Sequence, residues 1–252
     1  MPDDALSFVE AGHAGRPMVL IHGWCCNRSH MRGLAQHFAS THQVFSVDLP
    51  GHGETPLGDA LLSFEGFARR VADFCAARDL RDAVLVGHSL GGVVAVHAAG
   101  VCPDRIAAVV NLDGALPLRP EALAAYRRLF AEARERGFRA AVEPFVRQAY
   151  FLPHEAGAEA DALVAAMLAA PSDMAEALLG RFPEIDAPPV LRACRAPLLF
   201  IGSSHPRFDV AEVERLRPET WIARVAVSGH FVQLFALPQV VAMMEQFLAG
   251  VP

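Results

Sequence analysis

Several features that mark other classes of protein are missing from this chain of 252 residues. It has no excess of basic residues, because 22 Lys and Arg against 28 Asp and Glu give a formal net charge of -6. A surface that binds nucleic-acid phosphates needs positive charge, so we expect no nucleic-acid partner. No apolar run approaches the ~20 residues of a membrane-spanning helix, and we expect no membrane association either.

The cysteines, the candidate metal ligands and the N-terminal stretch indicate further absences. No group of His, Cys and Asp has the spacing of a zinc site. MPDDALSFVEAG at the N-terminus is acidic and lacks the basic and apolar regions of a signal peptide. The cysteines are odd in number and show no C-x-x-C spacing, which favours reduced thiols in the cytoplasm over a disulfide framework. They are Cys25, Cys26, Cys75, Cys102 and Cys194.

What the chain does have is short apolar runs, rich in β-branched residues, that alternate with helical patterns. AVLVG and AAVVNL are nearly hydrophobic throughout, as strands buried on both faces of a parallel sheet are. The alternation predicts an α/β fold with a mostly parallel central sheet flanked by helices. The predicted strands are 6–11, 18–22, 43–47, 83–87, 107–112, 197–202 and 221–227, and the predicted helices are 31–39, 63–78, 91–101 and 238–248.

The alternation of strands and helices stops within residues 116–190. Here the stretch PEALAAYRRLFAEARERG predicts a helix with Pro120 in its first turn and Gly137 just past its end. Further stretches rich in Ala and Leu follow. We interpret 116–190 as a helical cap, or lid, inserted into a core that comprises 1–115 and 191–252. A helical subdomain that only packs is the alternative.

The stretch AVLVGHSLGG carries the most informative motif. Residues 87–91, GHSLG, match G-x-S-x-G directly after a predicted strand and before a predicted helix, which is the context of a nucleophile elbow. The turn exposes the serine hydroxyl above the sheet, and the helix N-terminus behind it favours developing negative charge. Ser89 is therefore the candidate nucleophile. A chance glycine turn is the alternative, whereas the glycine spacing argues against a dinucleotide loop.

A candidate base and a candidate oxyanion hole are expected at the same edge of the sheet. His230, in SGHF, follows the last predicted strand, so it can reach Ser89 and take its proton. HGW at 22–24 also follows a strand, and the N–H groups of Trp24 and Leu90 can together bind an oxyanion. A glycine turn with a buried tryptophan is the alternative for this loop.

Four motifs together resemble those of the α/β-hydrolase superfamily, and the resemblance extends over nearly the whole chain. They are HGW, DLPGHGETP, GHSLGG and GHF. The resemblance implies an α/β-hydrolase fold, no cofactor, a cap after the strand at 107–112 and a Ser–His–acid triad. It does not identify a substrate, because this fold supports many chemistries.

The acid of the triad is not at its usual place in the sequence. In most relatives it follows the strand that PLLFIG represents here, in a pattern like G-x-x-D, but this chain has His205 there. Asp113 ends the strand after the elbow helix, where some branches of the superfamily carry their acid; a turn residue is its other interpretation. Asp209 is the alternative acid, although DVAE also reads as a helix start with Asp209 as N-cap and Glu212 reaching back. We favour Asp113, because an acid on another strand can still orient the imidazole.

We therefore expect a serine hydrolase of the carboxylic ester hydrolase type. It would cleave an ester, lactone, thioester or related acyl bond, or a C–C bond, of a small hydrophobic substrate through Ser89, His230 and Asp113. Aromatic residues of the cap at helical spacing can line a pocket or form a core, and the core is the commoner case. The pocket candidates are His22, His88, Tyr126, Phe130, Phe145, Tyr150, Phe151 and Phe231.

Two other functions stay open at this point. The tripeptide GWC and an acid at Asp113 resemble cofactor-free dioxygenases of N-heteroaromatic, quinolone-like substrates, in which a His–Asp pair is the base and the serine is no nucleophile. Cys26 stands where those enzymes have histidine, and their elbow reads SHSHGG. A receptor without catalysis is the third class and rests on fold analogy alone. In each case we expect a small-molecule partner and a monomer or homodimer.

Overall fold

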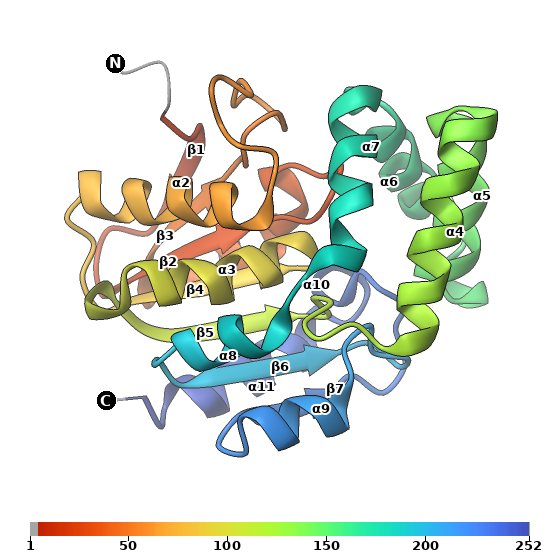
Figure 1. Ribbon diagram of the computed structural model, residues 1–252. Coiled ribbons are helices and arrows are strands. Elements are labelled where there is room, and N and C mark those ends of the chain that lie inside the picture. Colours follow the sequence, from red (N-terminus) through yellow and green to blue (C-terminus); the bar gives the residue numbers. More distant parts are fainter. Residues whose placement is uncertain (1–4, 252) are drawn as a thin grey trace.

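A seven-stranded sheet forms the centre of the protein (Figure 1), and the computed structural model describes residues 5–251. The strand order is β1-β3-β2-β4-β5-β6-β7; β1 pairs antiparallel with β3, and all other pairs are parallel. This sheet confirms the predicted α/β fold. The strands are β1 (Phe8–Ala11), β2 (Arg16–Ile21), β3 (His42–Val47), β4 (Ala83–His88), β5 (Ile106–Leu112), β6 (Leu198–Gly202) and β7 (Trp221–Arg224).

Helices pack on both faces of this sheet (Figure 1). One face is covered by α2 (Phe64–Ala77), α3 (Leu90–Val101), α8 (Ala187–Ala193) and α9 (Val210–Leu216), and the other by α1 (Arg32–Phe38), α10 (Val232–Phe235) and α11 (Leu237–Leu248). Successive strand residues point to opposite faces. Val19 and Ile21 of β2 therefore join the first apolar cluster, whereas Met18 and Leu20 join the second. Both faces of β2 are buried, as its continuous apolar run predicts.

A separate group of helices lies between β5 and β6 in the sequence and beside one end of the sheet in space (Figure 1). Its first helix begins with Pro120 and ends before Gly137, which has φ 87°, as the sequence predicts. The group consists of α4 (Pro120–Arg136), α5 (Phe138–Tyr150), α6 (Ala158–Leu168) and α7 (Ser172–Arg181).

Short 3-10 helices also occur in the described part of the chain, two before this group and two within or after it. They are η1 (Arg28–Met31), η2 (Pro103–Arg105), η3 (Pro153–Glu155) and η4 (Phe182–Glu184).

Two strands are shorter than the sequence predicts. β1 begins at Phe8, since the N–H of Ser7 donates to the hydroxyl of Thr55 at 2.8 Å. β7 ends at Arg224; just beyond it the N–H of Val225 still donates to the carbonyl of Gly202 in β6 at 3.0 Å, and that of Ala226 donates to the Gln239 side chain at 2.8 Å. The residue patterns that predict a strand are local, so they do not reveal side-chain partners that come from elsewhere in the sequence.

Across residues 5–251, no single helix is both long and apolar enough to cross a membrane. Two consecutive segments, Ala158–Leu168 and Ser172–Glu184, are long and apolar enough only when they are taken together. The chain bends by 95° between them.

Candidate active site

Ser89 lies on a tight turn between β4 and α3. Its backbone has φ 54° and ψ -117°, a conformation that costs a residue other than glycine of order 1–3 kcal/mol. Its N–H donates to the carbonyl of Leu112 at 2.9 Å, which ties the turn to the end of β5. A Cβ on Gly91, in the first turn of α3, would lie 2.5 Å from the carbonyl oxygen of His22. This position therefore has to be glycine. The turn thus has the geometry of a nucleophile elbow.

His230 and Asp113 meet at the carboxyl edge of the sheet. Nδ1 of His230 lies 2.7 Å from Oδ2 of Asp113, and the two side chains are 2% and 0% exposed. An ionised carboxylate only accepts hydrogen bonds, so the imidazole carries its proton on Nδ1 and leaves Nε2 as an acceptor. Asp113 therefore has the position from which an acid orients a base.

The surroundings of Asp113 keep it buried and hydrogen-bonded. Its Oδ1 accepts the N–H of Ser203 at 3.0 Å and that of Arg207 at 3.2 Å. Burial raises the pKa of Asp113 to about 6, although the Arg207 guanidinium and these two N–H groups oppose the rise. The carboxyl group is consequently ionised for the most part at pH 7.

The backbone and ring of His230 are held on several sides. Its N–H donates to the carbonyl of Tyr150 at 2.7 Å, and its own carbonyl accepts from Nε2 of His88 at 3.0 Å. Burial lowers the pKa of His230 well below its usual value, and the Arg207 guanidinium lowers it further. Nε2 has no hydrogen-bond partner in the described part of the chain. The ring is thus a neutral imidazole with one nitrogen unoccupied.

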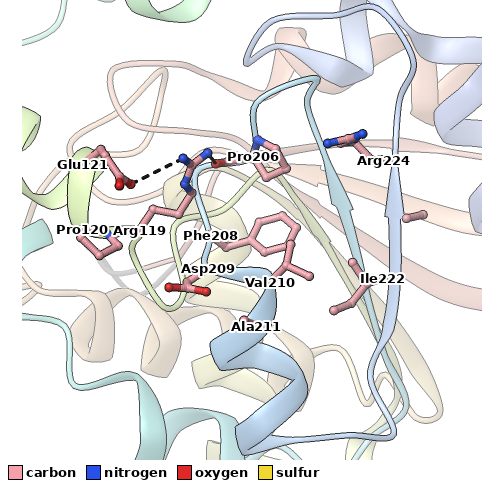
Figure 2. A pocket seen from close by; sticks show the side chains of 11 residues that line it. Arg119, Pro120, Glu121, Pro206, Phe208, Asp209, Val210, Ala211, Ile222 and Arg224 are labelled. Atoms are coloured by element: carbon pink, nitrogen blue, oxygen red, sulfur yellow. Dashed lines mark hydrogen bonds and ion pairs between the residues drawn. The ribbon is translucent and has the colours of Figure 1, made fainter.

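Asp209, the alternative acid, begins α9. Its side chain accepts the N–H of Glu212 at 3.1 Å, which is the N-cap bond that the sequence predicts. Glu212 pairs with Arg215 and does not reach back to the cap. Figure 2 shows Asp209 at the rim of a surface pocket of about 660 Å³. The carboxylate that faces His230 is that of Asp113.

The HGW loop lies directly against the elbow. A Cβ on Gly23 would come within 3.2 Å of Cβ of Ser89, so the close approach requires glycine. The N–H of Trp24 has no acceptor among residues 5–251, and the N–H of Leu90, the first residue of α3, has none within its helix. Both N–H groups are free to bind an oxyanion. The indole of Trp24 donates to the carbonyl of Ala175 in α7 at 2.9 Å.

The two histidines among the pocket candidates are packed inside the protein. His22 is fully buried; Nδ1 donates to the carbonyl of Gly23 at 2.8 Å, and Nε2 accepts the N–H of Leu49 at 3.0 Å. His22 therefore supports the loop and does not line a pocket. The ring of His88 lies 4.7 Å from that of His230. Burial lowers the pKa of both His22 and His88 well below the usual value, which keeps them neutral.

Three of the aromatic candidates surround the imidazole. The rings of Tyr150 and Phe231 lie 4.4 Å and 5.7 Å from that of His230, and Phe151 stacks on Phe231 at 5.5 Å. A pocket of about 410 Å³ opens here between the core and the α4–α7 group, and Phe151, His205 and His230 are among its lining residues.

The other three aromatic candidates lie farther back in the α4–α7 group. The Tyr126 hydroxyl is 3.2 Å from that of Tyr150, and the Phe145 ring is 5.7 Å from the Tyr150 ring. Phe130 packs against Gly180 of α7 so closely that a Cβ on this glycine would lie 3.0 Å from the ring. Tyr126 and Phe145 thus support Tyr150, and Phe130 holds helices together. All three act as core residues of the helical group and not as pocket residues.

Sequence reasoning missed two charged residues of this region. Glu155 is 6% exposed and accepts hydrogen bonds from the chain that precedes His230. Arg207 donates to the carbonyl of Ala149 and lies over the Tyr150 ring at 4.9 Å. Neither has a local signal, since LPHEAG and HPRFD read like surface loops.

No group of three or more His, Cys, Asp or Glu within residues 5–251 could hold a metal ion. All five cysteines are free thiols. Burial raises the pKa of Cys26 to about 12 and that of Cys25 well above its usual value, so the thiols beside Trp24 stay protonated.

Solved structures resemble the whole chain. An esterase from Thermogutta terrifontis matches with a TM-score of 0.81 and 23% identity over 97% of this chain and 93% of that one. The enol-lactonase from Burkholderia xenovorans LB400 matches with a TM-score of 0.84 and 17% identity over 97% and 96%. At these identities the likeness concerns the fold.

Curated proteins resemble part of the chain in sequence. The pimeloyl-[acyl-carrier protein] methyl ester esterase of Klebsiella pneumoniae (strain 342) is 32% identical over 172 residues, which are 65% of this chain and 63% of that protein. Esterase YbfF of Escherichia coli (strain K12) is 29% identical over 101 residues, which are 40% of this chain and 39% of that protein. The chain thus spans less than two thirds of the length of these relatives.

The sequence profile of the Alpha/beta hydrolase family matches residues 18–243. This range includes the HGW loop, the elbow, the α4–α7 group and His230. The chain therefore belongs to the Alpha/beta hydrolase family.

Proposed function

We propose that this protein is a serine hydrolase that cleaves a carboxylic ester or lactone of a small hydrophobic molecule. One observation carries the proposal: His230 lies 2.7 Å from Asp113, and its ring is 4.7 Å from that of His88, the residue directly before the strained turn at Ser89. The family relatives that are named as esterases support the same class of reaction.

Ser89 is the nucleophile of the proposed reaction. Its Oγ attacks the ester carbonyl carbon, and Nε2 of His230 takes the hydroxyl proton as the new C–O bond forms. Nε2 has no hydrogen-bond partner within residues 5–251, Oγ of Ser89 included, so the contact between serine and imidazole has to form when the substrate binds. No other donor of the described chain occupies that nitrogen. The Asp113 carboxylate stabilises the imidazolium that results.

The carbonyl oxygen becomes an oxyanion in this step, and the N–H groups of Trp24 and Leu90 bind it. Neither group has an acceptor within residues 5–251, and the two belong to segments in close contact, which supports the assignment. The tetrahedral intermediate then collapses, and His230 returns the proton to the departing alcohol. Water attacks the acyl-enzyme with His230 again as base, which releases the acid and restores Ser89.

The α4–α7 group serves as the cap in this proposal. Ser89 is 6% exposed, so the cap shields the ester carbonyl from bulk water and from competing hydrogen-bond donors. Tyr150, Phe151 and Phe231 surround the imidazole with aromatic surface, which suits an apolar acyl or alcohol group.

A burst assay tests the proposal. The protein is mixed with a short-chain p-nitrophenyl ester, and a fluorophosphonate is used separately to label the nucleophile. We expect a burst of p-nitrophenol and one covalent adduct on Ser89, and both should vanish in Ser89→Ala while circular dichroism shows an intact fold.

A different result would point to base chemistry without an acyl-enzyme. If Ser89→Ala keeps most of the activity while His230→Ala loses it, the proposed nucleophile is wrong. Oxygen uptake with a hydroxyquinolone would then identify the cofactor-free dioxygenase that GWC and Asp113 also resemble. No oxygen uptake together with ester cleavage by the unmodified protein supports hydrolysis.

A further inference from the structure

A buried carboxylate joins the cap to the loop that carries His230. Glu155 ends η3, and its side chain is 6% exposed. Oε1 accepts from the Ser228 hydroxyl at 3.0 Å and the Gly229 N–H at 3.0 Å. Oε2 accepts from the Leu152 N–H at 2.7 Å and the same Gly229 N–H at 3.1 Å. No cation within residues 5–251 forms an ion pair with it.

A carboxylate at such a depth is costly unless its oxygens are satisfied. Transfer of an unpaired charge into a protein interior is strongly unfavourable, and hydrogen bonds from N–H and O–H groups offset that cost. Here every donor comes from one of two places: Leu152 in the cap, or Ser228 and Gly229 directly before His230. Both oxygens of the side chain are therefore satisfied only while the two segments stay in contact.

The segment that Glu155 binds has no room to shift. A Cβ on Gly229 would lie 2.7 Å from Oε2 of Glu155 and 3.0 Å from Cα of Phe151, so the loop packs tightly against the cap. The next residue, His230, donates its N–H to the carbonyl of Tyr150 at 2.7 Å, a second bond to the cap. Ser204, in the loop after β6, also binds this stretch: its N–H donates to the Ser228 carbonyl at 2.9 Å, and its hydroxyl accepts the Ser228 N–H at 2.9 Å. The backbone on the N-terminal side of the imidazole is thus held by the cap on one side and by the core on the other.

The ring itself is bound from the core. Nδ1 faces Asp113 at 2.7 Å, and Nε2 of His88 donates to the His230 carbonyl at 3.0 Å. The titratable and charged groups around the ring are therefore Asp113, His88, Tyr150 and Arg207. Small movements of the loop change the Asp113 contact, because a hydrogen bond weakens steeply with distance and angle.

We infer that Glu155 is a positioning residue for His230. Through Ser228 and Gly229, it makes the His230–Asp113 contact depend on whether the cap is packed against the core. The inference rests on the proposed function, in which His230 is the base. Glu155 touches neither Ser89 nor the imidazole in these contacts, so its effect passes through the loop. When the cap is displaced, the carboxylate loses the Ser228 and Gly229 donors, and the segment before His230 keeps only its bonds to Ser204, which loosens the orientation of the base.

If Glu155 only held the cap to the core, without positioning His230, its variants would behave differently. They would change in thermal stability and keep the turnover of the folded protein. Positioning instead changes kcat more than KM, because orientation of the base matters in the transition state and much less in ground-state binding. It also changes the pH dependence, because an imidazole that moves away from Asp113 loses its anionic partner and its pKa falls.

The test compares Glu155→Gln with Glu159→Gln. Glu159 lies exposed at the start of α6 in the same cap and forms no ion pair or side-chain hydrogen bond within residues 5–251, so its variant matches the change of charge. In Glu155→Gln the amide NH₂ replaces one oxygen that accepts two donors. We expect kcat for a p-nitrophenyl ester to fall roughly ten- to a hundredfold with KM nearly unchanged. The acid limb of kcat/KM should move to lower pH, while Glu159→Gln matches the unmodified protein.

Ser228→Ala provides a second and milder variant. It removes one donor to Oε1 and leaves Gly229 bound, so we expect kcat to fall about fivefold, less than in Glu155→Gln. If Glu155→Gln does not fold, Ser228→Ala decides alone. Unchanged kcat and an unchanged acid limb in a folded Glu155→Gln or Ser228→Ala protein would overturn the inference, even if the melting temperature drops.

A substrate-free measurement separates this inference from the proposed function. With ¹⁵N-labelled histidines, NMR follows the tautomer and titration of His230, which is assigned by its loss in His230→Gln. Glu155→Gln should shift that titration to lower pH, and an identical titration in both proteins contradicts positioning. Retained hydrolysis in Ser89→Ala would instead contradict the proposed function and leave the NMR result to decide the role of Glu155.

Discussion

The carboxylate of Asp113 lies 2.7 Å from Nδ1 of His230, although 117 residues separate them in the sequence. Asp113 follows β5, which pairs with β4, so the carboxylate and Ser89 extend from adjacent strands. Ser203 follows β6 in the same loop as His205, which stands where the family resemblance places the acid, and Ser203 donates its N–H to this same carboxylate. The usual acid loop thus supports Asp113 and contributes no carboxylate of its own to the contact.

Replacement of Asp113 by asparagine should lower kcat by ~10⁴, because the amide no longer holds the proton on Nδ1 of His230. Steady-state kinetics with a p-nitrophenyl ester measure the loss. Asp209→Asn is the matched control, since Asp209 caps α9 and asparagine is an equally good N-cap. A large loss in Asp209→Asn with an active Asp113→Asn would reverse the assignment of the acid.

Gly23→Ala should lower kcat/KM by roughly 10²–10³, the effect of losing one oxyanion-hole donor. The added Cβ would lie 2.9 Å from Nδ1 of the buried His88 ring and 3.2 Å from Cβ of Ser89, so the loop that carries the Trp24 N–H is pushed away from the elbow. In the control Gly33→Ala, the new Cβ meets only Cδ2 of Leu237 at 2.8 Å, the end of a flexible side chain. Equal activity of the two variants would show that Trp24 contributes nothing to the oxyanion hole.

The backbone strain at Ser89 can be measured directly. Ser89→Gly and Ser89→Ala both remove the hydroxyl, and they differ only in the Cβ that a φ of 54° disfavours. Relief of strain in glycine exceeds its extra unfolded-state entropy, so Ser89→Gly should be about 1 kcal/mol more stable than Ser89→Ala. Urea denaturation gives the difference. A more stable alanine variant would mean that the turn stores no strain.

His52 should make the protein sensitive to acid. Burial lowers its pKa to about 4, while Nε2 accepts the Cys25 N–H and Nδ1 donates to the Pro50 carbonyl. Because the unfolded chain takes up this proton near pH 6.5 and the folded one does not, stability is lost as the pH falls from about 6.5 to 4. The loss from this residue is about 3 kcal/mol.

Urea unfolding at several pH values between 7.5 and 4 checks the sensitivity to acid. His52→Gln should flatten the dependence of the unfolding free energy on pH, and His13→Gln, at an exposed position, should not. Parallel curves for His52→Gln and the unmodified protein would mean that His52 is protonated in the folded state as readily as in the unfolded one.

The sheet and most of its helices could be predicted because their signals are local. Buried parallel strands are continuous apolar runs, and proline and glycine mark the ends of α4. The start of β1 could not be predicted, because the Thr55 hydroxyl that accepts the Ser7 N–H comes from elsewhere in the chain.

The sequence by itself determined the α/β fold, the strained turn at Ser89 and the placement of His230 after the last strand, since each depends on residues within a few positions of one another. It left two carboxylates open for the contact with the imidazole, and only the tertiary structure placed Asp113 there and Asp209 at a helix start. It gave no sign of Glu155, because the burial of a carboxylate depends on donors 73 and 74 residues away. Local patterns decide backbone conformation, whereas the partner of a buried charge is decided by how distant segments pack.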